Sequence, residues 1–128
     1  MSRTAFSILH RQVESRLRRG LLTVVDATNL GNGARRPLLW RARRHAFPAV
    51  AIVFDLPGSV VHERNASRAE RVVGAAIVDD QLARLRNLVD LGTFDVEGFE
   101  AVHRFPHAEA VDSARVSRVN RPGSSPAR

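Results

Sequence analysis

Apolar and polar positions in this chain fall into blocks that alternate between helical and strand spacing. In the first block apolar residues recur three or four positions apart, which predicts an amphipathic helix over 4–19 that ends at Gly20. The run LLTVVDATN (21–29) is short, apolar and β-branched, so it predicts a buried parallel strand with polar groups at its carboxyl end. GNG (31–33) predicts a loop. Residues 34–46 predict a helix whose inward face comprises Leu38, Leu39, Ala42 and Ala46.

The middle of the chain repeats this order. AVAIVFDLP (49–57) predicts a second buried strand, and 58–71 predicts a helix. A break at Gly74 precedes another predicted helix over 75–90. The apolar residues of this helix that are available for packing are Ile77, Leu82, Leu85, Leu88 and Val89. GTFDVEG (92–98) predicts a turn.

The last part of the chain predicts one more strand and then loses its periodicity. FEAVHRF (99–105) predicts a third strand, 107–119 a last turn or short helix, and the Pro/Gly/Ser-rich residues 120–128 a disordered tail. Helices that alternate with strands indicate βαβ units, so we expect an α/β fold with a mostly parallel sheet in one domain over 1–119. Ligands bind beyond the carboxyl ends of the strands in such sheets, where Asp26 and Asp55 lie.

Composition adds a strong positive charge to this picture. All 20 basic residues are arginine, and the net charge of +7 favours polyanionic partners: nucleic acid, nucleotides or an acidic membrane surface. The arginine content equally fits the base composition of the coding DNA. There is no cysteine for disulfides or thiolate metal sites, and no apolar stretch approaches the length of a membrane span. The first residues do not form a secretory signal, so the cytoplasm is the expected location.

Two stretches carry candidate chemistry. In HERNASRAER (62–71), Arg64, Arg68 and Arg71 share one face of a predicted helix, which indicates either a solvated surface or a clamp for a polyphosphate. In VVDATN, Asp26, Thr28 and Asn29 follow a predicted strand. These groups either orient a Mg²⁺-bound phosphate or cap the next loop.

No direct metal site is predicted. The five histidines are scattered and show no metal-ligand spacing.

The order VVDATN, ARRPL, VAIVFDLP, HERNASRAER resembles the kinase domain of bacterial polynucleotide kinase–phosphatases. Gln81 with Leu85 and Arg86, the stretch EGF (97–99) with Val102, and the later Val111, Ala114, Val116 and Arg118 extend the resemblance over about residues 8–119. It implies a P-loop kinase-type three-layer fold and transfer of the ATP γ-phosphoryl group to a 5′-hydroxyl RNA or DNA end.

The resemblance also implies roles for individual residues. Arg64 and Arg71 of a lid segment (62–71) would contact the phosphates, with Arg68 in support, and Asp26 would lie beneath them. ATP and Mg²⁺ are the implied cofactors. The loop from Phe105 to Val111 would lie near the adenine.

The chain departs from the family in one decisive respect: it has no lysine, so it has no G-x-x-x-x-G-K-[ST] phosphate-binding loop. We therefore expect an amino-terminally truncated kinase domain, without its first strand and P-loop. Such a chain would be inactive alone and marginally stable, and a separate P-loop half is an expected partner. Asp79 and Asp80 also place negative charge where a polynucleotide would favour positive charge. The alternatives are an arginine-rich nucleotide- or RNA-binding remnant and part of a P-loop kinase for a small substrate.

Overall fold

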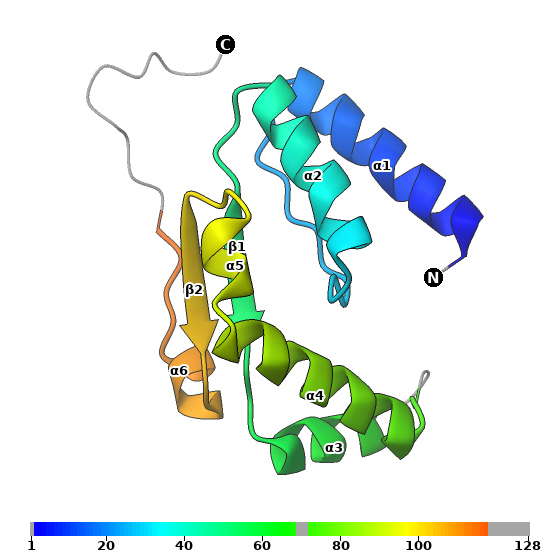
Figure 1. The fold of residues 1–128 in the computed structure, drawn as a ribbon, viewed down its shortest axis with the longest axis vertical. Helices are drawn as coiled ribbons and strands as arrows, with labels where there is room; N and C mark the ends of the chain where they lie inside the picture. Colours follow the sequence, from blue (N-terminus) through cyan, green and yellow to red (C-terminus); the bar gives the residue numbers. More distant parts are fainter. Residues whose placement is uncertain (1, 69–71, 118–128) are drawn as a thin grey trace.

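The computed structural model describes residues 2–68 and 72–117, and its elements run helix, helix, strand, helix, helix, helix, strand, helix (Figure 1). They are α1 (Arg3–Arg18), α2 (Asn32–Arg44), β1 (Val50–Phe54), α3 (Gly58–Ala66), α4 (Ala75–Asp90), α5 (Thr93–Val96), β2 (Ala101–Phe105) and α6 (Ala108–Asp112). No helix in these two ranges is both long and apolar enough to cross a lipid bilayer.

Strands β1 and β2 pair in parallel, in a register that sets Val50 opposite Ala101 and Phe54 opposite Phe105. The chain between them forms α3, α4 and α5, which is the crossover that parallel strands require. The predicted α/β class and the parallel pairing are therefore confirmed.

The predicted strand over 21–29 does not form. This segment is described throughout, yet it belongs to no strand, and Leu22 and Val24 are each 81% exposed. A strand is stabilised by hydrogen bonds to a neighbour, and both sheet strands of the described residues pair only with each other. The apolar composition of this segment therefore did not suffice to place it in the sheet.

Helix α2 differs from its prediction at both ends. It begins at Asn32, so the stretch predicted as a loop forms its first turn, and Pro37 lies in its second turn rather than its first. It ends at Arg44 because Ala46, predicted to face inward, adopts a left-handed conformation (φ 57°) and is exposed. Leu39 and Ala42 are buried, as predicted.

The third and fourth helices also differ in detail. Helix α3 ends at Ala66 instead of reaching residue 71. In α4 the buried residue is Val78, whereas its neighbour Ile77 is 55% exposed. The stretch predicted as a turn contains the short helix α5, which buries Phe94.

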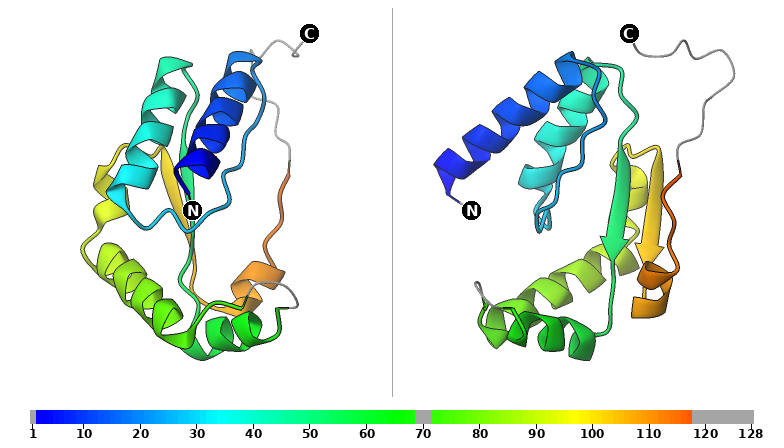
Figure 2. Two further views of the ribbon diagram at one scale, coloured as in Figure 1. Left: turned by 90° about the vertical axis from the view of Figure 1, so that its right-hand side faces the viewer. Right: turned by 180° about the vertical axis from the view of Figure 1, so that it is seen from behind.

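The core lies on one side of the sheet. Helices α2, α4 and α5 occupy that side (Figure 2, left panel). The buried apolar residues come from α1, α2, β1, α4, α5 and the turn after β1: Val13, Leu17, Leu39, Ala42, Val53, Leu56, Val78 and Phe94.

The opposite side of β1 is uncovered by any described helix (Figure 2, right panel). Val50, Ile52 and Phe54 alternate along this side and are 47%, 57% and 53% exposed. Parallel sheets normally have a helical layer on each face. Of the three layers expected, the described residues therefore form two: the sheet and the helices on one side of it.

Candidate functional site

Helix α3 carries the predicted phosphate-binding arginines. Arg64 lies in its last turn and Arg68 just beyond its end, and both are exposed. Within the described ranges, neither guanidinium makes a hydrogen bond or ion pair. Both therefore keep their donors free for an anion. Arg71, predicted to act with Arg64, lies outside the described residues.

Two contacts fix this helix against its surroundings. His62 Nε2 lies 2.6 Å from the Asp79 carboxylate of α4. Asn65 donates to the carbonyl of Val73 at 2.6 Å and accepts from the Val73 amide at 2.9 Å, which closes the loop after the helix. Sequence reasoning missed Asn65, because its partner lies eight residues further along the chain and no local turn motif links the two. The Asp79 carboxylate is therefore paired with His62 and is not an isolated negative charge.

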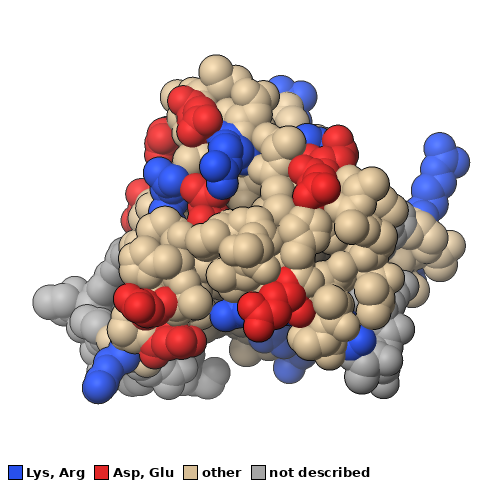
Figure 3. Space-filling view, turned by 90° about the horizontal axis from the view of Figure 1, so that it is seen from below, with Lys and Arg blue, Asp and Glu red and all other residues tan. Residues whose placement is uncertain are grey.

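The underside of the molecule in Figure 1 is not uniformly basic. Viewed from below, it shows acidic and basic side chains interspersed among uncharged ones (Figure 3). Any anion bound there would be held by individual arginines rather than by a broad positive field.

The segment predicted as a strand ends in a tight turn. Asp26 and Thr28 are exposed, and their side chains make no hydrogen bond or ion pair within the described residues. Asn29 adopts a left-handed conformation (φ 49°), which asparagine tolerates, and its amide donates to the Ala27 carbonyl at 3.3 Å. Asp26 and Thr28 are thus available to a ligand, whereas Asn29 shapes the turn.

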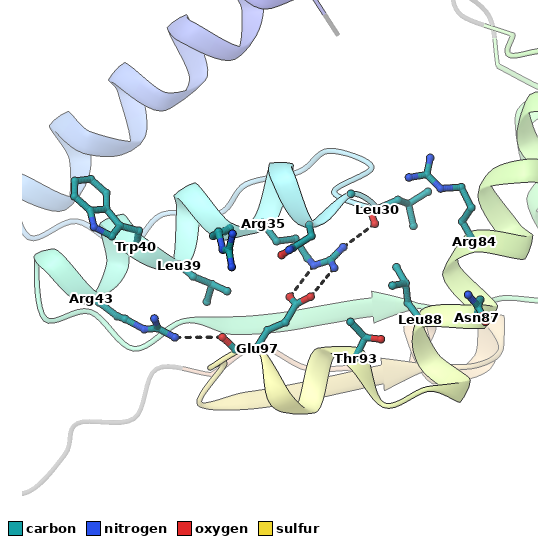
Figure 4. Close-up of a pocket in the computed structure, with 13 residues that line it drawn as sticks. Leu30, Arg35, Leu39, Trp40, Arg43, Arg84, Asn87, Leu88, Thr93 and Glu97 are labelled. Atoms are coloured by element: carbon teal, nitrogen blue, oxygen red, sulfur yellow. Dashed lines mark hydrogen bonds and ion pairs between the residues drawn. The ribbon is translucent and has the colours of Figure 1, made fainter.

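Arg35 of α2 holds this turn in place and was not predicted to matter. It is 5% exposed and bonds Glu97 through two parallel contacts, of 2.8 Å from Nε and 2.6 Å from Nη2. Its Nη1 donates to the carbonyls of Asn29 (2.9 Å) and Leu30 (2.8 Å) (Figure 4). The guanidinium also lies 5.0 Å from the centre of the Phe94 ring. Two motifs 62 residues apart, RRPL and EGF, therefore meet in one buried ion pair.

At the carboxyl end of the sheet, the polar group is already paired. Asp55 accepts from Arg104 at 2.7 Å, which leaves it less available to a ligand than Asp26. Phe105 stacks on Phe54 with ring centres 5.7 Å apart, so it extends the uncovered apolar face of the sheet. Val111 is half-buried in α6, the short helix that follows this strand.

Two groups with shifted pKa values lie between α1 and α2. Burial, with a smaller effect from Arg41, holds the pKa of His10 below its ordinary value. A hydrogen bond from His45 at 2.8 Å is the largest of the effects that lower the pKa of Glu14. Glu14 also lies 3.6 Å from Arg41, so this cluster joins the two helices and has no evident part in catalysis.

The two parts of the predicted phosphate site, the turn at Asp26 and helix α3, make no direct polar contact with each other in the described residues. No hydrogen bond or ion pair among the described residues joins Asp26, Thr28 or Asn29 to α3. No group of three His, Asp or Glu side chains in the same ranges could hold a metal ion. The phosphate-binding roles of Arg64, Arg68 and Asp26 stay predictions.

Comparison with known proteins identifies the family. A family model described as an AAA domain matches residues 2–88, from the start of α1 to near the end of α4. The chain belongs to this AAA-domain family. Its fold is accordingly that of a P-loop kinase-type domain, and the match includes the Asp26 turn and the lid segment. A search of curated proteins gave no match to the AAA-domain chain.

Proposed function

We propose that this chain is the lid-bearing part of an ATP-dependent kinase that phosphorylates 5′-hydroxyl ends of RNA or DNA in the cytoplasm. The observation that carries the proposal is the pair of guanidinium groups without a partner in the described residues, Arg64 in the last turn of α3 and Arg68 just beyond it, in a P-loop kinase-like domain. Arginine forks match the charge that spreads over phosphoryl oxygens during transfer. In this reading Arg64 and Arg71 hold the phosphates, and Arg68 supports them.

The available donors fit ATP with Mg²⁺. Mg²⁺ in kinases commonly takes one or two protein ligands and completes its shell with phosphate oxygens and water. The free carboxylate of Asp26 and hydroxyl of Thr28 suit that need, directly or through water. When bound, the cation would offset negative charge on the transferring phosphate. Adenine would lie near the loop from Phe105 to Val111.

The kinase would be completed by a P-loop half that adds to the sheet. β1 has one edge free of strand partners within the described residues, and one of its faces exposes Val50, Ile52 and Phe54. Leu22 and Val24 of the extended 21–29 segment are also exposed. An incoming strand would satisfy the free edge, and a helix following it would cover the apolar face.

A reconstitution assay tests the function. The chain is mixed with a P-loop half consisting of a strand, G-x-x-x-x-G-K-[ST], the following helix and the family's general-base segment. Transfer of labelled phosphate from ATP to a 5′-hydroxyl oligoribonucleotide is then measured. We expect no transfer by the chain alone and Mg²⁺-dependent transfer by the mixture. Arg64→Gln should lower the rate at least about tenfold, since an arginine on a transferring phosphate contributes that much or more.

The matched control is Arg86→Gln, which removes one exposed arginine from α4 and should leave the rate unchanged. A complex that phosphorylates a small acceptor but not the oligoribonucleotide would establish the small-substrate alternative. If the chain binds RNA in a salt-sensitive way that Arg64→Gln does not alter, and the mixture transfers no phosphate, the chain is a non-catalytic binding remnant.

A further inference from the structure

A groove separate from the lid segment lies between α2, α4 and α5 (Figure 4). Its volume is about 790 Å³, within the usual range of ligand-binding pockets. Leu39 and Leu88 supply apolar wall, and the buried pair of Arg35 and Glu97 forms part of its lining. The groove therefore combines an apolar surface with a buried, hydrogen-bonded ion pair.

The charges that remain in the groove are all positive. Among the described residues Glu97 is the only acidic one that lines it, and Arg35 neutralises it. Three further arginines line the groove: Arg36, Arg43 and Arg84. Arg36 and Arg84 have no hydrogen bond or ion pair within the described residues, and Arg43 uses one donor on the Glu97 carbonyl at 3.2 Å. Figure 4 shows Arg43 and Arg84 toward opposite ends of the groove, so an anion that satisfies both must be extended.

An aromatic side chain accompanies these arginines. Trp40 lines the groove and is 54% exposed, although a large aromatic ring gains from burial. The guanidinium groups of Arg44 and Arg41 lie 5.3 Å and 5.8 Å from the ring centre, so the ring already contacts two cations. Exposed aromatic rings beside arginines are the combination that binds single strands, since the rings take bases and the guanidinium groups take phosphates.

We infer that this groove binds a single-stranded polynucleotide, with its phosphates on Arg36, Arg43 and Arg84 and a base against Trp40. An inorganic polyphosphate would use the arginines and leave the ring without a role. The inference concerns binding alone, so it does not require phosphoryl transfer. It is also separate from the lid segment, because the contacts that fix α3 do not involve these residues.

Trp40 is the only tryptophan, and the chain has no tyrosine, so its fluorescence reports directly on the groove. The full chain is titrated with oligo(U) and, separately, with inorganic polyphosphate. Oligo(U) should quench the fluorescence, because a base stacks on the ring, and polyphosphate should not. The double variant Arg36→Gln/Arg84→Gln should weaken oligo(U) binding at least about tenfold and reduce its salt dependence by about 1.4 in log–log slope, for two lost phosphate contacts.

Arg86→Gln in α4 and Arg11→Gln in α1 serve as single-charge controls at exposed positions that do not line the groove, and both should bind oligo(U) within about twofold of the parent chain. Circular dichroism before titration confirms that each variant folds. Equal weakening by all the variants would mean diffuse attraction to a basic chain and would overturn the assignment. Equal quenching by polyphosphate and oligo(U) would overturn the role of Trp40. If the reconstituted mixture transfers no phosphate while the chain alone still binds oligo(U) through Arg36 and Arg84, the proposed kinase function is refuted and this groove assignment stands.

Discussion

The buried pair of Arg35 and Glu97 should be the most sensitive polar contact of the described structure. Arg35→Met removes the partner of a carboxylate that is only 13% exposed and leaves the carbonyls of Asn29 and Leu30 without their donor. Breaking a buried ion pair from one side costs about 3–5 kcal/mol of folding free energy. With a urea dependence of about 1.5–2 kcal/mol per molar, the unfolding midpoint should fall by roughly 2 M.

The assay is urea unfolding followed by the fluorescence of Trp40, which lies on the same helix as Arg35. The variants are Arg35→Met, Glu97→Met and the double substitution. The double variant should lose at least about 2 kcal/mol less folding free energy than the two single variants lose together, because it buries no uncompensated charge.

A surface pair provides the matched control. Arg18→Met breaks an ion pair with Glu14 at 3.8 Å in which Arg18 is 71% exposed, and it should change stability by less than about 1 kcal/mol. If Arg35→Met is as mild as Arg18→Met, or if the two single losses add in the double variant, the assignment of Arg35 as the anchor of the Asp26 turn is refuted.

Two further predictions concern pH and the uncovered sheet. The pKa of His10 lies below 6.5 in the folded chain, so the unfolded chain binds more protons and the free energy of unfolding should fall as pH drops through 6.5. The pKa of Glu14 is also lowered, so stability should fall again as pH drops below 4.5. Urea midpoints measured against pH test this: His10→Asn should abolish the first loss, and a midpoint that rises on acidification would contradict it. Ile52 is 57% exposed, so Ile52→Thr should change the free energy of unfolding by less than about 1 kcal/mol and reduce binding of a hydrophobic dye. Val53 is 5% exposed, so Val53→Thr should lower the free energy of unfolding by about 2 kcal/mol. Similar losses from both substitutions would mean that the Ile52 face is covered.

The sequence predicted most of the helices because their apolar residues follow a helical period. Phe6, Leu9, Val13 and Leu17 locate α1, and Leu39 and Ala42 are buried in α2, as their spacing indicates. The ends were less well predicted. A helix end depends on local backbone geometry, and nothing in the side chain of Ala46 announces a left-handed conformation.

The contacts that position the candidate site could not be predicted from local pattern. Arg35 and Glu97 stand 62 residues apart, and each looks like an ordinary surface charge within its own helix or turn. Only the fold brings them together, and in doing so it turns one arginine of a basic helix into a structural residue. Its neighbour Arg36, with the same chemistry one position later, is left exposed and free of partners in the described residues. The helical rotation of about 100° between adjacent residues decides which of the two anchors the fold and which stays exposed.

The failed strand and the uncovered sheet have one common explanation. Residues 21–29 have the composition of a buried strand but pair with nothing, and β1 has the composition of a strand covered on both faces but exposes Val50, Ile52 and Phe54. Both features fit the proposed P-loop half, because a parallel sheet that lacks a middle strand and a covering helix exposes one strand edge and one apolar face. A single added strand–helix unit would correct both, by pairing with β1 and with 21–29 and by covering the apolar face. The predicted strand over 21–29 is wrong for the described fold, whereas the predicted strand over 99–105 forms as β2. We propose that 21–29 joins the sheet only when such a unit is present.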